Sequence, residues 1–191
     1  MAKLHFYFSA MNAGKSTTLL QSSYNYNERG METLLFSPAI DTRSGSGKIS
    51  TRIGLSAPAT PVHPETDLFE AIQLAYASNP GIHCILVDEA QFLNKSQVKG
   101  LAKVADVLKL PVLTYGIRTD FQGEPFEGSQ YLLAWADILV EIKTICHCGR
   151  KAIMNVRTDE HGNKVTHGNQ IDLGGNERYT ATCRYHFYAQ E

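Results

Sequence analysis

LHFYFSAMNAGKS, residues 4–16, is the stretch of this 191-residue chain that decides its fold. Residues 4–8 are nearly all apolar or aromatic, which predicts a strand covered on both faces. A loop follows, and a helix is expected over about residues 15–29, with Gly30 as its stop. The stretch therefore predicts a strand, a loop and a helix in direct succession.

The loop in this stretch has the spacing of the phosphate-binding motif G-x-x-x-x-G-K-[ST], with Ser9 at the first Gly position. Gly14 lets the chain turn tightly, Lys15 brings a positive charge to the β- and γ-phosphates of ATP, and the Ser16 hydroxyl can bind Mg²⁺. Backbone N–H groups of the loop and the helix N-terminus complete the site. The expected phosphate-binding residues are Ser9, Ala10, Met11, Asn12, Ala13, Gly14, Lys15 and Ser16. An A-G-K-S string can also begin a helix by chance, but the strand before it and an acidic residue downstream argue against this.

A second apolar run, residues 82–87, predicts a buried strand that ends in Asp88-Glu89. Asp88 is expected to bind Mg²⁺ beside the phosphate loop, and Gln91 to lie near ATP. Three interpretations remain open for Glu89. It could orient water in an ATPase, accept a proton from an acceptor hydroxyl in a kinase, or be a surface acid without a catalytic role. The D-E-A-Q string also resembles a helicase box, but such helicases need a second nucleotide-binding domain, for which this chain has no room.

Strands and helices alternate up to about residue 143, which predicts a mostly parallel sheet flanked by helices, the RecA-like α/β fold of P-loop proteins. Residues 41–64 are rich in Gly, Pro, Ser and Thr and are expected to form a long flexible loop. The other expected strands cover 33–37, 111–116 and 138–142, and the other expected helices cover 67–77, 95–108 and 128–136. We expect a P-loop domain over 1–143 and a small β subdomain over 144–191.

The C-terminal subdomain holds a cysteine and histidine pattern that predicts a structural zinc site. Cys146 and Cys148 form a C-x-C pair, and Cys183 and His186 form a C-x-x-H pair. Three thiolates and one imidazole make a closed tetrahedral site, which can stabilise a unit too small for its own core. His147 could replace one ligand, and four unrelated residues remain an alternative. Cys84 lies in an apolar run and is expected in the core.

Composition excludes several classes of protein. The chain carries 18 basic and 19 acidic residues, which argues against a sequence-independent nucleic-acid binder. The apolar stretch at the N-terminus is too short for a signal peptide, and no later run is long enough to span a membrane. We therefore expect a cytoplasmic protein that binds neither nucleic acid nor membrane.

Taken together, these motifs resemble the type II thymidine kinase family, which includes bacterial and human cytosolic enzymes. The resemblance covers essentially the whole chain and depends on five strings: SAMNAGKS at 9–16, DEAQF at 88–92, GIRTDF at 116–121, GSQYLLAW at 128–135 and GGNERY at 174–179. It implies transfer of the ATP γ-phosphate to the 5′-hydroxyl of thymidine, with deoxyuridine as another possible substrate. It also implies a homotetramer and feedback inhibition by dTTP.

The resemblance also implies roles for particular residues. Glu89 matches the general base, whereas Lys15, Ser16 and Asp88 match the phosphate and Mg²⁺ ligands. Positions around the thymine ring correspond to Met11, Phe92, Ile117, Phe121 and Phe126; the family match favours the site for each Phe, with a core position as the alternative. Residues 171–179 match a lasso loop, in which Ile171, Gly174 and Tyr179 are expected near the nucleoside. Asp41 and Arg43 belong to a D-T-R string; Arg43 could meet phosphate or be a solvated loop residue.

Two other functions remain open from the sequence. One is a nucleic-acid-stimulated P-loop ATPase with a structural zinc module, in which Glu89 would activate water. The other is a structural zinc protein with a vestigial nucleotide site. Nucleoside selectivity is implied by the family resemblance and does not follow from the spacing of the motifs.

Overall fold

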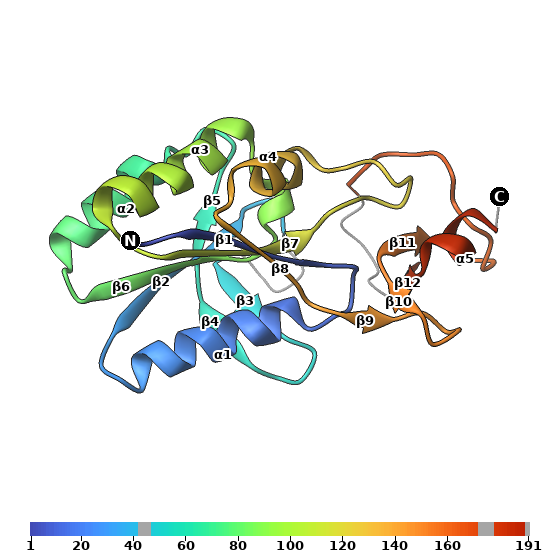
Figure 1. Ribbon diagram of the computed structural model, residues 1–191, viewed down its shortest axis with the longest axis horizontal. Coiled ribbons are helices and arrows are strands. Elements are labelled where there is room, and N and C mark those ends of the chain that lie inside the picture. The colour runs from blue at the N-terminus through green and yellow to red at the C-terminus, as the bar shows by residue number, and fades with distance from the viewer. Residues whose placement is uncertain (42–46, 172–177, 190–191) are drawn as a thin grey trace.

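The computed structural model describes residues 1–41, 47–171 and 178–189, and in this part of the chain the main sheet has six strands (Figure 1). Every neighbouring pair in this sheet is parallel. In spatial order the strands are β5 (Thr60–Val62), β2 (Glu32–Pro38), β6 (Ile82–Val87), β7 (Val112–Ile117), β1 (Leu4–Ser9) and β8 (Ile138–Glu141). The expected mostly parallel α/β fold is confirmed.

Helices cover both faces of this sheet, as Figure 1 shows. The helices are α1 (Lys15–Asn27), α2 (Leu68–Ser78), α3 (Lys95–Lys103), the π-helical turn η2 (Val104–Leu108) and α4 (Glu127–Trp135). Helix α1 lies on one face, where Leu19 and Leu20 pack on residues of β2, β6 and β7. The other helices cover the opposite face, where Ile72, Leu101 and Leu132 share a core with β1 and β6. From Cys84 to Val87, successive β6 side chains alternate between the two cores, which explains the apolar run at this end of the strand.

Local signals set the helix ends. The Asp67 side chain accepts a hydrogen bond from Glu70 N–H at the start of α2. Asn94 and Gln97 form a reciprocal capping box at the start of α3. The expected helix over 95–108 is therefore present, although its last five residues form the π-helical turn. Among the described residues, no helix is long and apolar enough to cross a lipid bilayer.

The expectation of one long loop over residues 41–64 is wrong for its described part. Strands β3 (Lys48–Ser50) and β4 (Ser56–Pro58) form an antiparallel hairpin, and β5 joins the edge of the main sheet beside β2. Ile49 anchors the hairpin because its side chain is buried in the core under α1. Strands of three residues carry too little periodicity to stand out from a Gly- and Pro-rich composition.

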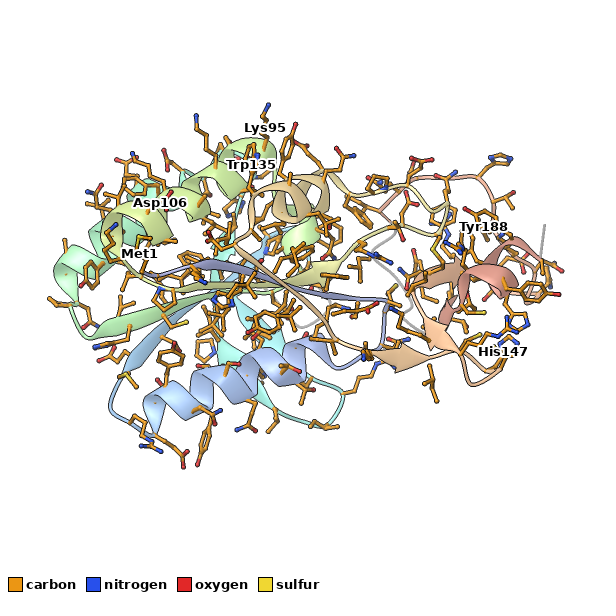
Figure 2. The ribbon with its side chains drawn as sticks, viewed as in Figure 1. Met1, Lys95, Asp106, Trp135, His147 and Tyr188 are labelled. Carbon is orange, nitrogen blue, oxygen red and sulfur yellow. The ribbon has the colours of Figure 1, made fainter. Side chains whose placement is uncertain are left out.

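The C-terminal residues form short elements beyond β8. Strands β9 (Thr144–Ile145) and β10 (Lys151–Ala152) pair with each other, as do β11 (Met154–Arg157) and β12 (Tyr179–Thr182). The helix α5 (Arg184–Tyr188) follows, where only β segments were expected. Figure 2 shows His147 and Tyr188 at this end of the molecule, far from Asp106. The separate-domain boundary near residue 143 stays a prediction.

Gly128 allows α4 to approach the turn η1 (Ala90–Phe92) more closely than any larger residue would permit. A Cβ atom on Gly128 would lie 2.4 Å from Ala90 O and 2.8 Å from Gln91 O, and backbone cannot move away as a side chain can. We expect Gly128→Ala to lower the free energy of unfolding by about 3 kcal/mol, the upper range for overpacking, measured by chemical denaturation.

Gly81→Ala is the matched control for this substitution. Its Cβ would meet the end of the Asn79 side chain at 2.9 Å, and that side chain can rotate away. A similar loss of stability in both variants would contradict the role assigned to Gly128.

Candidate functional site

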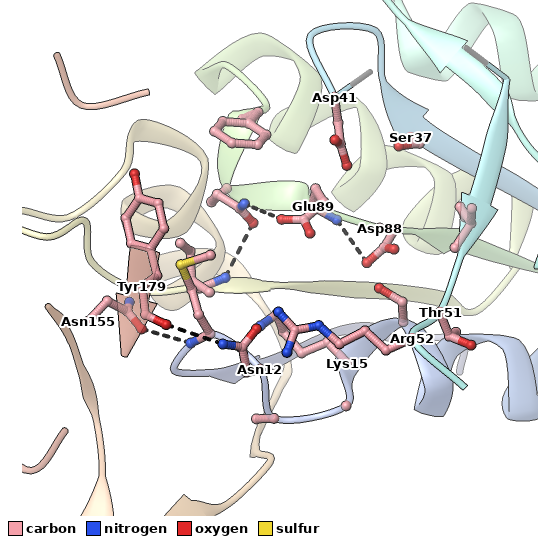
Figure 3. Close-up of a pocket in the computed structure, with 18 of the residues that line it drawn as sticks. Asn12, Lys15, Ser37, Asp41, Thr51, Arg52, Asp88, Glu89, Asn155 and Tyr179 are labelled. Atoms are coloured by element: carbon pink, nitrogen blue, oxygen red, sulfur yellow. Dashed lines mark hydrogen bonds between the residues drawn. The ribbon is translucent and has the colours of Figure 1, made fainter. Parts of the chain in front are cut away.

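One cavity of about 360 Å³ opens at the carboxyl end of the sheet (Figure 3). Parallel pairing places the ends of three strands there: Ser9 of β1 pairs with Ile117 of β7, and Asp88 directly follows β6. Carboxyl ends of parallel strands are the usual place for ligand sites in α/β proteins. The cavity is lined by the phosphate loop, by Asp88 and Glu89, by five apolar or aromatic side chains, and by residues of the hairpin β3–β4 and of the C-terminal unit.

The phosphate loop has the backbone shape that its sequence predicts. Gly14 has φ 84° immediately before α1, a conformation that glycine adopts without a Cβ penalty. Lys15 is buried, and its ammonium donates to Ser9 Oγ at 3.2 Å and to Ala10 O at 3.1 Å. Ser9 at the first Gly position thus supplies a hydroxyl that positions the lysine. The residues of the motif that line the cavity are Met11, Asn12, Ala13, Gly14, Lys15 and Ser16; Ser9 and Ala10 are not among the lining residues.

Asp88 and Glu89 face this loop from the end of β6. Asp88 is only 4% exposed, and burial raises its pKa to about 7; the nearby Glu89 carboxylate adds to the rise. Hydrogen bonds from the Ser16 hydroxyl and Glu89 N–H and the charge of Lys15 act in the opposite direction on this pKa. A buried carboxylate beside a serine hydroxyl is a suitable oxygen pair for a divalent cation, which would favour its ionised form.

Glu89 has a strained backbone, with φ 46° in the left-handed region. Its N–H donates to Asp88 Oδ1 at 3.0 Å, and its carboxylate accepts a hydrogen bond from Gln91 Nε2. The other atom of the Gln91 amide, Oε1, accepts from Ile117 N–H at 3.3 Å. The hydrogen bonds described for the Gln91 side chain are thus with Glu89 and β7. The expected contact between Gln91 and ATP stays a prediction.

Part of the cavity lining is apolar or aromatic. The structure brings together the five side chains expected around the base: Met11, Phe92, Ile117, Phe121 and Phe126. The Phe92 and Phe126 rings pack edge to face, with their centroids 5.7 Å apart. The Arg157 guanidinium lies 3.7 Å from the centre of the Phe121 ring. Phe121 and Phe126 are buried and Phe92 is partly buried, and all three line the cavity. For Phe121 and Phe126, burial and a place in the cavity wall are therefore compatible.

Other expected residues can be placed in the same cavity. Asp41, Ile171 and Tyr179 line it. Arg43 and Gly174 lie outside the described residues, so their expected contacts remain predictions. The structure adds lining residues that sequence reasoning missed: Thr51, Arg52, Asp120, Asn155 and Gln170. Asp120 lies in the GIRTDF string, from which only Ile117 and Phe121 were assigned to the site. No motif marks the other four, because they come from short or irregular segments that only the fold brings to the site.

The four expected metal ligands converge in the C-terminal unit. The ligand atoms of Cys146, Cys148, Cys183 and His186 all lie within 4.8 Å of one another. The Cys148 and Cys183 sulfurs are 3.8 Å apart, and His186 Nδ1 lies 3.5 Å from Cys183 Sγ. A tetrahedron with Zn–S bonds of about 2.3 Å has edges of about 3.8 Å, so the spacing fits a zinc ion.

The chemistry of these ligands also suits zinc. Although burial opposes ionisation, hydrogen bonds from the backbone N–H groups of Cys148 and Cys183 lower the pKa of the Cys146 thiol to about 5. A thiolate is the form that binds metal. His147 stacks on His186 with ring centroids 4.3 Å apart, but it is not a member of the four-atom group.

Comparison with known proteins identifies the family. A profile described as thymidine kinase matches residues 2–187. Thymidine kinases of Coxiella burnetii, Mannheimia succiniciproducens and Vibrio cholerae are 71%, 62% and 60% identical to this chain over 187 residues. These alignments cover 98% of this chain and 95%, 95% and 97% of the three relatives. The chain belongs to the thymidine kinase family.

Membership in the thymidine kinase family confirms the resemblance seen in the sequence motifs. The family agrees with a cavity that is lined both by a phosphate loop and by aromatic side chains. The family does not by itself assign a role to each residue.

The burial of Asp88 predicts a pH-dependent cost to stability. Because its pKa rises from 3.8 to about 7 on folding, the folded protein binds this proton more tightly than the unfolded chain. The free energy of unfolding should therefore fall as the pH rises through this range, and the loss is complete above pH 7. We expect Asp88→Asn to be more stable than the unsubstituted protein at pH 8 without Mg²⁺, by thermal denaturation, with a smaller difference at pH 5.

Asp106→Asn serves as the control because Asp106 is an exposed residue of η2 (Figure 2). It should change the melting temperature little at either pH. If Asp88→Asn is less stable at pH 8, or its advantage does not grow with pH, the proposed desolvation of Asp88 is wrong.

The metal-ligand geometry predicts different results for two adjacent histidines. His186→Ala should lose bound zinc and lower the melting temperature, because it leaves three thiolates without the fourth ligand. His147→Ala should keep about one zinc per chain. Zinc content by mass spectrometry checks this. Zinc lost from His147→Ala but retained in His186→Ala would show that His147, and not His186, is the ligand.

Proposed function

We propose that this chain is a thymidine kinase that transfers the γ-phosphate of ATP to the 5′-hydroxyl of thymidine, giving dTMP and ADP. The observation that carries the proposal is that Glu89 lines the same cavity as the phosphate loop and the three phenylalanines, beside Asp88 and above Lys15 (Figure 3). Family membership supports the choice of thymidine as the acceptor. Both substrates would then meet at a carboxylate able to accept a proton.

The phosphate end of the cavity would bind ATP. The first residues of α1 line the cavity, and the helix dipole favours negative charge at this end of the helix. Lys15 would leave its contacts with Ser9 and Ala10 to meet the phosphates. Mg²⁺, when bound with ATP, would neutralise charge on the transferring phosphoryl group, and the Ser16 hydroxyl and Asp88 are the residues that would hold it.

Glu89 would act as general base. Its carboxylate would take the proton from the 5′-hydroxyl as the oxygen attacks the γ-phosphorus, while ADP leaves on the opposite side. Gln91 supports this role because its amide orients the carboxylate and is itself fixed by Ile117 N–H. The strained φ of Glu89 fits a side chain whose direction matters for function.

The aromatic end would bind the base. Phe92, Phe121 and Phe126 supply apolar surface, and Ile171 and Tyr179 close the pocket from the C-terminal unit. Burying the thymine methyl group is worth about 0.8 kcal/mol, which is roughly fourfold in binding. Deoxyuridine is therefore expected to be a weaker substrate rather than excluded.

Further parts of the proposal depend on the family resemblance. They are structural zinc at the Cys₃His group, Mg²⁺ with ATP, feedback inhibition by dTTP, a homotetramer and a cytoplasmic location. dTTP would satisfy both ends of the cavity, since it carries a thymine base and a triphosphate.

Glu89→Gln tests the proposed base. The amide cannot accept the proton, so kcat should fall by about 10³-fold. Affinity for a non-hydrolysable ATP analogue should stay near that of the unsubstituted enzyme. Steady-state kinetics and calorimetry check the two results.

Glu65→Gln is the control, because Glu65 is an exposed acid outside the cavity. Its kcat should be unchanged. A near-native kcat for Glu89→Gln would show that another group removes the proton.

A further inference from the structure

The buried amide of Asn155 lies where three separate segments meet. Asn155 belongs to β11 in the C-terminal unit and is 1% exposed. Its Oδ1 accepts from Met11 N–H of the phosphate loop at 2.7 Å (Figure 3). Its Nδ2 donates to Thr119 O, after β7, at 3.0 Å. One side chain thus joins two loops that are more than a hundred residues apart in sequence.

On the phosphate side, this amide acts on a strained part of the loop. Asn12, directly after Met11, has φ 61°, a conformation that costs a non-glycine residue free energy and persists only when its surroundings enforce it. The Asn12 side chain donates to Tyr179 O at 3.3 Å, which is a second link to the C-terminal unit. Since Met11 N–H is bound to Asn155, it is not available to phosphate, and its role is to set the direction of the loop.

On the nucleoside side, Thr119 begins the segment that carries two aromatic residues of the pocket. Thr119 pairs with Pro125 in an isolated β-bridge, and Phe121 and Phe126 lie within and just after this turn. The Asn155 amide fixes the carbonyl at the start of the turn. Movement of Thr119 would therefore shift the aromatic wall of the cavity.

We propose that Asn155 is a positioning residue. It fixes the position of the phosphate loop relative to the aromatic wall, and so the position of the ATP γ-phosphate relative to the nucleoside 5′-hydroxyl. The inference depends on the proposed function for the identity of those substrates. It gives the C-terminal unit a role beyond closing the pocket, because β11 and β12 contact the ATP side of the cavity through Asn155 and Tyr179 O.

A merely structural role would give a different pattern. Strand β11 is also attached to its surroundings by pairing with β12 and by the small core of Met154, Val156 and Phe187. Val156 is 2% exposed, so Val156→Ala weakens the same strand without touching the amide. It is therefore the matched control for loss of stability alone.

The test compares Asn155→Leu, Asn155→Asp and Val156→Ala in the full chain. Leu removes both hydrogen bonds at similar volume. Asp at pH 8 keeps an acceptor for Met11 N–H but places an oxygen against Thr119 O. The readouts are KM for ATP, KM for thymidine, melting temperature, and hydrogen exchange of the phosphate-loop peptide without ligands.

We expect Asn155→Leu to raise both KM values on the order of tenfold, since it leaves a buried donor and a buried acceptor unsatisfied. Asn155→Asp should raise KM for thymidine and leave KM for ATP within about twofold. Exchange at residues 9–14 should speed up in Asn155→Leu and not in Asn155→Asp. Val156→Ala should lower the melting temperature with both KM values unchanged.

Two results would overturn the inference. The first is that Asn155→Leu and Val156→Ala lose the same melting temperature and also have the same KM for ATP and the same KM for thymidine. The other is unchanged exchange of the phosphate-loop peptide in Asn155→Leu. A wild-type chain that phosphorylates no thymidine would instead contradict the proposed function, and the exchange experiment would still test the contact between Asn155 and the loop.

Discussion

Parallel pairing of β1, β6 and β7 is the constraint on which the site depends. Because the three strands run in the same direction, their carboxyl ends meet at one edge of the sheet, and the residues that follow each strand share one cavity. The phosphate loop follows β1, Asp88 and Glu89 follow β6, and the turn that carries Phe121 follows β7. The C-terminal unit then closes this edge through β11 and β12.

Several groups at this edge are unfavourable to the folded chain by themselves. Asp88 is a buried carboxylate with a raised pKa, and Asn12 and Glu89 have positive φ angles. Such features persist where surrounding contacts enforce them, and here those contacts come from Lys15, Gln91 and Asn155. The arrangement suits a site that binds a nucleotide together with a divalent cation, since the cation would supply counter-charge to Asp88.

The sequence predicts the parts of the fold that depend on local spacing. The motif at 9–16, the Asp88-Glu89 pair after an apolar run, and the Cys and His pairs each carry their chemistry within a few residues, and the structure brings each set together. The hairpin β3–β4 and helix α5 escaped prediction because their elements are too short to show a period. Asn155 could not be found, since its partners Met11 and Thr119 are adjacent only in the folded chain.

We infer that the phosphoryl group of ATP goes to a nucleoside and not to water. ATP consumption by the purified, zinc-loaded chain, measured in parallel with thymidine, deoxyuridine, deoxycytidine, single-stranded DNA and no acceptor, tests it most directly. We predict rapid ADP formation with thymidine, slower formation with deoxyuridine, and only background with DNA or no acceptor. Release of inorganic phosphate that DNA stimulates in the absence of any nucleoside would contradict the account.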